Sequence, residues 1–461
     1  MFRNIFNTFA NCFKIPELKS RILFTLGLLA ICRLMAYIPI PSLDGSALAT
    51  FLRENAHGFG GLLGLQNMFS GGAYENCAIG ALGIMPYISA TIILQLMTAV
   101  IPRLSKLARE EGGRAKIIQY GRYLTILICV IYGTYFALGW ENPQKSLGGN
   151  FQGQLVLVQN QTWYLIETVL VMTTGTMLLV WLGEQITERG VGNGVSLVIT
   201  IGIVARLPLA VRGIRDMFFG PQAAHNWLGD GILLAVLSIV VVGGVIAVTQ
   251  AQRKIPVQYA SRMVGQKMYQ GGTNYMPLKV NYSGVMPIIF AQSILMMPNP
   301  ICVWIATHAT TPVISDTFQS LATQLAYGSP LYLAIYALMI LFFSYFWVAT
   351  QFNEIQIADD LKKNGGYIPG VRPGQGTSDY LHKAMSRITL AGALFLTVIA
   401  TLPIILYNKL GVDQNVAQFF GGTSILITVG VLLDTMRQVE SHLMMRHYDG
   451  FLKKGRLRGR F

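Results

Sequence analysis

The sequence has few charged residues for its length. Asp, Glu, Lys and Arg make up 12% of the 461 residues, whereas hydrophobic residues make up 52%. Soluble domains carry about 25% charged residues, so this chain has too few charges to coat the surface of a soluble protein of its size. Disordered chains combine low hydrophobicity with high net charge, which is also not the pattern here. The composition therefore predicts a polytopic membrane protein.

Sequence patterns for cofactors and catalysis are also missing. The five cysteines include no CxxC pair, which argues against a disulfide framework or a cysteine metal site. There is no GxxxxGKS or GxxxxGKT loop for nucleotide phosphates and no HExxH zinc motif. Few ionisable residues are expected at membrane depth (Arg33, Glu167 near the outer end of the stretch 162–184, and Asp434 near the inner end of the stretch 421–444), and no carboxylate pair marks an ion relay at a helix centre. We therefore expect no cofactor and no enzymatic activity.

Long apolar stretches, in contrast, are abundant. A helix needs about 20 largely apolar residues to cross a bilayer core of about 30 Å. Of the 35 Lys and Arg residues, 28 fall in one alternating set of connections, six in the other and one inside the first stretch. By the positive-inside rule, this asymmetry predicts that both termini are cytoplasmic. The ten expected spans are residues 21–40, 76–101, 117–139, 162–184, 194–213, 230–250, 284–305, 329–350, 386–407 and 421–444.

Three connections between these stretches are unusual. Residues Gly58–Gly72 (GFGGLLGLQNMFSGG) are apolar but too short to span, so they form either a re-entrant segment or an outer-surface loop. Residues 252–282 carry five cations and no acidic residue, and residues 353–387 carry five cations and four acidic residues. Such connections act as orientation signals beside anionic lipid or as docking sites for acidic or nucleic-acid-bearing partners. The residues alone leave both interpretations open.

Seven long motifs occur in order along nearly the whole chain. They are YIPIP (Tyr37–Pro41), NMFSGGA (Asn67–Ala73), ALGIMPYISATIILQL (Ala81–Leu96), RGVGNGVSL (Arg189–Leu197), PLKVNYSGVMPIIFA (Pro277–Ala291), IPGVRPG (Ile368–Gly374) and FGGTSILI (Phe420–Ile427). Together they resemble the SecY/Sec61-alpha family, whose members are the channel subunits of the general protein-secretion translocon. The resemblance is much more specific than anything the composition predicts.

The resemblance implies an all-α membrane fold. Ten transmembrane helices would form two pseudo-symmetric five-helix halves around a central hourglass pore. The expected segments are a cytoplasmic N-terminal segment 1–20, an N-terminal half 21–213 that includes a plug at 62–72, an external hinge 214–229, a C-terminal half 230–444 with cytoplasmic loops 252–282 and 353–387, and a basic cytoplasmic tail 445–461.

The resemblance also implies four sets of functional residues. The pore ring, which closes around the chain in transit, is Ile84, Ile88, Ile199, Ile289 and Ile427. The plug, which blocks the outer funnel, contributes Leu62, Leu63, Leu65, Asn67, Met68, Phe69 and Ser70. The lateral gate, which opens toward lipid, contributes Ser89, Thr91, Gln95 and Asn281. The residues expected to dock a motor or ribosome are Arg253, Lys254, Arg262, Lys267 and Arg372.

The implied function is a protein-conducting channel of the cell inner (plasma) membrane. It would translocate unfolded secretory polypeptides and release transmembrane segments through the lateral gate. The implied partners are the SecE and SecG subunits, the SecA ATPase, the ribosome, signal sequences and nascent polypeptides, and membrane lipids. Two alternatives are an ion-coupled solute transporter, which predicts intramembrane carboxylates, and an intramembrane enzyme, which predicts a catalytic constellation. The sequence shows few of the first and no evident example of the second.

Overall fold

The computed structural model is mostly helical and divides into two units. One unit comprises Met1–Arg215 with Ile427–Phe461, and the other comprises Asp216–Leu426. The expected halves, 21–213 and 230–444, stay a prediction, and this division differs from them in grouping the end of the chain with the first unit. The structure describes residues 15–54, 62–110, 112–141, 155–158, 160–219, 227–259, 262–264, 267–269, 272–295, 298–309, 311–326, 328–410, 416, 419 and 423–454.

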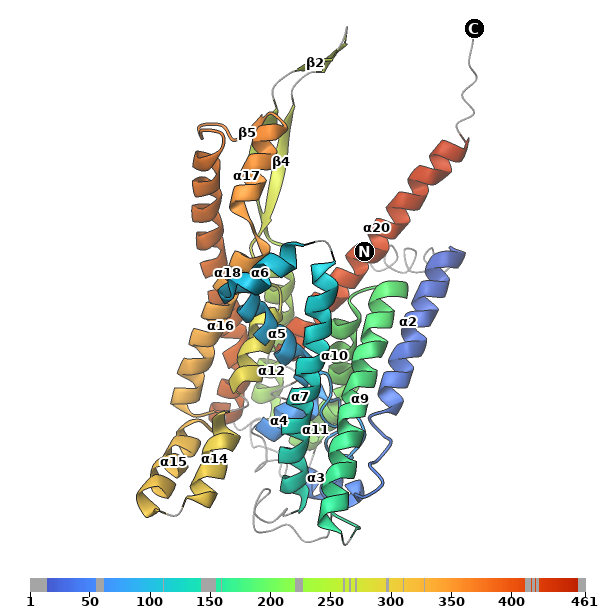
Figure 1. The fold of residues 1–461 in the computed structure, drawn as a ribbon, viewed down its shortest axis with the longest axis vertical. Coiled ribbons are helices and arrows are strands. Elements are labelled where there is room, and N and C mark those ends of the chain that lie inside the picture. The colour runs from blue at the N-terminus through green and yellow to red at the C-terminus, as the bar shows by residue number, and fades with distance from the viewer. Residues whose placement is uncertain are drawn as a thin grey trace. The chain divides into compact units, whose positions relative to one another are not determined.

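The first unit is built from long apolar helices joined by short ones (Figure 1). Helices α7 and α9 pack side by side, with Gly133 of α7 next to Val169 of α9. Helices α11 and α20 each extend across the boundary between the units. The helices are α2 (Pro16–Leu34), α3 (Gly45–Glu54), α4 (Leu62–Phe69), α5 (Met85–Val100), α6 (Pro102–Arg109), α7 (Gly113–Glu141), α9 (Gln161–Arg189), α10 (Gly194–Val204), α11 (Leu207–Phe219) and α20 (Thr423–Lys454).

Local sequence signals set several of these helix ends. The side chains of Asn160 and Asn193 accept backbone hydrogen bonds at the first turns of α9 and α10, as N-cap residues do. Helices α5 and α6 meet at a bend of 106°. The bend falls at Pro102, which fixes its own φ and cannot donate a helical hydrogen bond.

The core of the first unit is rich in aromatic side chains. Tyr74 lies 5.1 Å from Phe136 and 5.5 Å from Trp140, measured between ring centroids. The Tyr164 hydroxyl donates to the Ala137 carbonyl at 3.1 Å. Each buried aromatic ring contributes roughly 1.5–3 kcal/mol of transfer free energy. This core therefore anchors the segment that follows α4 to α7 and α9.

The connection between α2 and α4 is also ordered by polar contacts. The Asp44 carboxylate accepts from the Ser46 hydroxyl at 2.7 Å and from the Ser46 backbone N–H at 2.9 Å. These hydrogen bonds, the hydroxyl's first, lower the pKa of Asp44. Asp44 immediately precedes α3, where a carboxylate satisfies free N–H groups at the helix start.

The second unit combines apolar helices with a small sheet. Strands β1 and β4 form a long antiparallel ribbon with Arg253 opposite Leu278, and its far end carries the β2–β3 pair (Figure 1). The helices are α12 (Trp227–Gln250), α13 (Met286–Leu295), α14 (Pro298–His308), α15 (Pro312–Gln324), α16 (Pro330–Gln351), α17 (Glu354–Lys363) and α18 (Gln375–Leu410). The strands are β1 (Gln252–Tyr259), β2 (Arg262–Val264), β3 (Lys267–Tyr269), β4 (Thr273–Lys279) and β5 (Gly366–Tyr367).

The sheet joins the two long connections of this unit. Strand β5 pairs with β1 through Gln258 opposite Tyr367, so the strand order is β4-β1-β5. Ile255 and Val257 alternate with exposed residues on β1 and enter a core that includes residues of α16 and α18. In the described residues, the expected loop 252–282 therefore contains strands β1 to β4, and the expected loop 353–387 contains α17, β5 and the start of α18.

Membrane-spanning potential is concentrated in a subset of the helices. Among the described residues, five helices are long and apolar enough to cross a bilayer, and the bent pair α5–α6 passes as a sixth. The expected span 284–305 is built as two helices, α13 and α14, with Pro298 at the start of the second. The chain is thus a helical membrane protein, and the count of ten spans stays a prediction.

Candidate functional site

The short helix α4 is enclosed by the first unit. It has only eight residues, too few to cross a bilayer, and it packs against α10. Of the seven expected plug positions, Leu62, Leu63 and Leu65 have a described backbone, but their side chains lie outside the described part, and Ser70 is half-buried. Four side chains are almost fully buried, with exposed fractions of 3–5%: Gln66, Asn67, Met68 and Phe69.

Two glycines bring the end of this helix against its neighbours. Gly71 has φ +66°, a conformation that favours glycine. A Cβ at Gly71 would lie 2.2 Å from Nη1 of Arg33 and 2.8 Å from the Cα of Gly202. Arg33 of α2 donates from Nη2 to the Gly71 carbonyl at 3.0 Å. A cation at the C-terminal end of a helix complements its dipole, so α2 holds this end of α4.

A glutamine holds the opposite face of the short helix. Gln66 donates from Nε2 to the carbonyls of Ala81 and Leu82, both at 3.2 Å. These carbonyls belong to the turns that precede α5, where Gly83 has φ +60° and lies close to Ser70. The turns displace the start of the helix expected at residue 76 to Met85.

An ion pair links the segment after α4 to the end of α10. Nη2 of Arg206 lies 3.7 Å from Oε2 of Glu75, and the two side chains are 14% and 10% exposed. Asn67 of α4 donates to the same carboxylate oxygen at 3.1 Å. The sequence alone does not indicate Glu75 or Arg206 as site residues, because no local motif joins them.

A small cavity lies beside the short helix. Its volume is about 20 Å³, enough for about one water molecule. Its lining includes Arg33, Phe69, Ser70, Ile84 and Gly202. Phe69, Ser70 and Ile84 thus meet at one spot, which brings expected plug and pore-ring residues together inside the first unit.

The expected pore-ring residues are all buried. Their exposed fractions range from 1% for Ile427 to 6% for Ile88. Four of the five belong to the first unit, and Ile289 of α13 belongs to the second. Burial suits both a ring and an ordinary core, so the ring itself stays a prediction.

The expected gate residues divide between the same two units. Thr91 donates its hydroxyl to the Tyr87 carbonyl of its own helix at 2.8 Å. Gln95 has a buried Oε1 with no hydrogen-bond partner among the described residues, and Ser89 is half-buried. In the second unit, Asn281 is buried and accepts from the Ser283 hydroxyl at 3.3 Å. The gate between α5 and α13 stays a prediction.

Expected docking residues lie on the ribbon and beside it. Arg253 and Lys254 are exposed on β1, and Arg372 is exposed in the connection that follows β5. Arg262 and Lys267 fall on β2 and β3, where their side chains lie outside the described part. The pairing of β1 with β5 joins the two long connections that carry these exposed cations.

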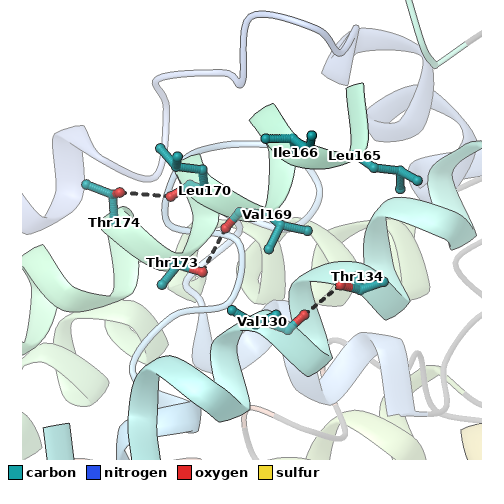
Figure 2. A pocket seen from close by; sticks show the side chains of 8 residues that line it. All are labelled: Val130, Thr134, Leu165, Ile166, Val169, Leu170, Thr173 and Thr174. Atoms are coloured by element: carbon teal, nitrogen blue, oxygen red, sulfur yellow. Dashed lines mark hydrogen bonds between the residues drawn. The ribbon is translucent and has the colours of Figure 1, made fainter. Parts of the chain in front are cut away.

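An apolar groove lies between α7 and α9. It measures about 480 Å³. Figure 2 shows the Thr134, Thr173 and Thr174 hydroxyls donating to carbonyls of their own helices, at 2.7–2.8 Å. The other lining residues are Val130, Leu165, Ile166, Val169 and Leu170. With its hydroxyls already engaged, this groove suits hydrocarbon better than a polar substrate. Elsewhere too, no group of three or more His, Cys, Asp or Glu in the described part could hold a metal ion.

Fold and site together define a helical membrane protein with a short helix packed inside it, and the comparisons with known proteins name its family. The family model SecY matches residues 78–436. "Protein translocase subunit SecY" of Chlamydia muridarum is 40% identical over 460 residues, covering 98% of this chain and 99% of the relative. The counterpart from Streptomyces scabiei is 44% identical over 450 residues, covering 96% and 99%. The chain belongs to the SecY family.

Solved structures agree on the fold. A structure described as "The structure of a protein conducting channel" aligns with a TM-score of 0.58 at 17% identity, covering 95% of this chain and 94% of that one. The yeast Ssh1 complex, solved bound to the yeast 80S ribosome, aligns with a TM-score of 0.58 at 18% identity, covering 88% of each chain. At these identities the likeness shows the fold alone.

Proposed function

We propose that the chain is the channel subunit of a protein translocase and conducts unfolded secretory polypeptides across the plasma membrane. It is a channel and not an enzyme, as its membership of the SecY family implies. The observation that carries the proposal is the enclosed helix α4. It contacts α2, α10 and the turns before α5, in a chain that belongs to the SecY family. An ion-coupled transporter, the alternative, has no support from these comparisons.

An aliphatic ring suits such a channel physically. The side chains of Ile84, Ile88 and Ile199, with Ile289 and Ile427, offer no hydrogen-bonding group to an ion. A narrow apolar constriction excludes water and ions by dewetting. Because apolar contact is non-directional, the same ring closes on any side chain of a moving polypeptide. The plug, residues Leu62–Gly72, covers this constriction when no polypeptide is present.

A lateral gate explains how transmembrane segments leave the channel. Hydrogen bonds between polar side chains in membranes contribute only about 0.6–2 kcal/mol each. The apolar core of a signal sequence, about 7–15 residues long, gains about 0.8 kcal/mol for each buried CH₂ group. A signal that partitions between α5 and α13 thus outweighs the few polar contacts offered by Ser89, Thr91, Gln95 and Asn281. The substrate itself opens the gate.

The driving force that moves the polypeptide through the channel comes from partners on the cytoplasmic side. The exposed cations Arg253, Lys254 and Arg372 suit the phosphate backbone of ribosomal RNA or acidic groups of the SecA ATPase. Both termini lie in the cytoplasm, since 28 of the 35 cations belong to that side. SecE and SecG complete the channel, and anionic lipids attract the basic connections. The expected segment boundaries, including the two halves and the hinge 214–229, are part of this proposal.

Crosslinking to a stalled secretory chain tests the function directly. Single cysteines replace Ile88 and Ile289 in a background without the five native cysteines, and a thiol-reactive maleimide, whose double bond adds the cysteine thiol, is placed in the stalled polypeptide. We expect crosslinks at both positions. A cysteine at Leu170, which is 62% exposed on α9, is the matched control and should not react. If neither Ile88 nor Ile289 ever captures the polypeptide, the chain does not conduct it through this constriction.

Reversal of one exposed cation tests motor docking. Arg372→Glu should abolish SecA-driven export in a reconstituted assay, since it turns an attractive contact into a repulsive one. Membrane assembly should stay normal, because the Arg372 side chain is exposed. Lys383→Glu, an exposed cation on α18, is the control and should export normally. Normal export by Arg372→Glu would remove Arg372 from the docking surface.

A further inference from the structure

A charged contact secures the plug in a way that packing alone does not require. The Asn67 amide of α4 donates to Oε2 of Glu75 at 3.1 Å, and the Glu75 backbone N–H donates back to Oδ1 of Asn67 at 3.2 Å. The nitrogen and the oxygen of the Asn67 side-chain amide therefore bind, respectively, the side chain and the backbone of Glu75.

Arg206 joins this pair to the channel wall. It lies in the turn between α10 and α11, and its Nη2 atom is 3.7 Å from the oxygen of Glu75 that accepts from Asn67. One carboxylate oxygen thus connects the plug helix to the end of a membrane helix. All three side chains are largely buried, with exposed fractions of 5% for Asn67 and 10% and 14% for Glu75 and Arg206.

Stability does not explain this arrangement. Replacing a buried ion pair by apolar residues is often neutral or stabilising, whereas removing one partner is strongly destabilising, because the other charge stays buried and unpaired. Such a pair is therefore suited to a switch, in which the two charges separate together at a defined step. Here Asn67 belongs to the plug (Leu62–Gly72), Glu75 follows the plug by three residues and Arg206 follows α10, so the three side chains connect the plug to the end of α10.

We propose that Asn67, Glu75 and Arg206 form a charge latch that holds the plug closed and sets how strong a signal sequence must be to open the channel. This proposal rests on the proposed function, because it assumes that α4 leaves its seat during translocation. The charge latch is a specificity device: it discriminates between polypeptides by the work needed to separate one ion pair.

Water makes the charge latch release abruptly. The attraction between unit charges about 4 Å apart is roughly fourfold weaker in bulk water than at an effective dielectric constant of 20. While the constriction is dry, the pair resists separation. Once a signal sequence admits water beside the plug, the attraction falls, and each separated group is hydrated. A signal that merely touches the channel leaves the latch closed.

Charge exchange tests the charge latch. Single variants Glu75→Gln and Arg206→Gln each remove one charge of this ion pair, so we expect the resting ion conductance in planar bilayers to rise at least ~10-fold. The same variants should secrete a reporter whose signal sequence is weakened. The double variant E75R/R206E restores an opposite pair and should return both readouts toward normal. Arg206→Lys, which keeps the charge, should behave nearly as the original chain.

A second ion pair provides the matched control. Nη2 of Arg122 lies 2.6 Å from Oε2 of Glu184, and this ion pair joins α7 to α9, not the plug to α10. Arg122→Gln and Glu184→Gln should leave resting conductance and signal selectivity unchanged. Export of a reporter with a normal signal sequence reports that each variant is folded and assembled.

The possible outcomes separate the latch from the plug itself. If deletion of Leu62–Gly72 raises the conductance but the single variants do not, the plug is real and the latch is wrong. If E75R/R206E leaks as much as the two single variants combined, the charges are not coupled and the latch is again wrong. If even the deletion leaves the conductance unchanged, both the latch and the sealing role of α4 are refuted, while the crosslinking at Ile88 and Ile289 still decides whether the chain conducts polypeptides.

Discussion

Two parts of the first unit, the expected plug and the four expected pore-ring positions that this unit contains, are held by different forces. Helix α4 is held at one end by Arg33, on one face by Gln66, and through Asn67 by the Glu75–Arg206 pair. The pore-ring isoleucines are buried among apolar side chains without any hydrogen-bonding group of their own. Polar contacts need a defined geometry and weaken when water competes for the same groups, whereas apolar contacts are non-directional and tolerate changes in the shape of the partner. In the proposed channel, polar contacts thus hold the part that leaves its seat, and apolar contacts form the part that closes on the polypeptide.

Removal of the whole plug should have the largest effect. Deleting Leu62–Gly72 removes the contacts from Arg33, Gln66 and Asn67 together, and several hydrogen bonds of about 1 kcal/mol each predict a resting conductance raised well beyond tenfold. Planar-bilayer recording measures this directly. Conductance equal to that of the intact chain would show that polar anchoring and sealing are unrelated.

A polar group within the ring should break the second half of the comparison. Ile88→Asn buries an amide without a partner, which costs about 1–3 kcal/mol and favours a wetted constriction. The variant should admit reporters with poorly hydrophobic signals. Ile93→Asn on the exposed side of the same helix is the control. Background secretion in the Ile88 variant would mean that this residue is ordinary core.

Removal of a single polar anchor should have a moderate effect. Gln66→Met keeps an unbranched side chain of similar length but loses the hydrogen bonds to the Ala81 and Leu82 carbonyls, each about 1 kcal/mol. The resting conductance should rise severalfold, less than after the deletion. A variant indistinguishable from the original chain would indicate that packing, not hydrogen bonding, seats this face of α4.

Exchange of one aliphatic side chain for another should have the smallest effect. Ile199→Leu conserves volume and typically costs less than about 1.5 kcal/mol. Secretion and resting conductance should stay close to normal, because a ring of this kind needs only apolar bulk. A large leak would show that the seal depends on exact shape, and the contrast with the plug would then disappear.

Long apolar helices were the most predictable part of the fold. The stretches 117–139, 162–184 and 329–350 lie within α7, α9 and α16, since a sustained apolar run has few other solutions in a membrane protein. The stretch 76–101 was less accurate: hydropathy cannot distinguish apolar turns around Gly83 from apolar helix, so α5 begins only at Met85. The ribbon at 252–282 was missed, although the alternation of Ile255 and Val257 is a strand signal.

The candidate site divided in a similar way. Motif resemblance pointed to the short helix and to the isoleucines, which the structure buries. It did not indicate Glu75 and Arg206, because their relation exists only in three dimensions and neither residue stands out in a local pattern. In the sequence, Arg206 is one of the six cations that fall in the smaller set of connections. The structure shows that its side chain is largely buried and lies beside Glu75.

The three-stranded sheet of the second unit has a mechanical consequence. Because β5 pairs with β1, and β1 shares a core with α16 and α18, the two long connections cannot move independently. A partner that binds the ribbon would thus also be coupled to α16 and α18. A force applied to the ribbon would therefore reach α16 and α18 together, through the core that Ile255 and Val257 share with both helices.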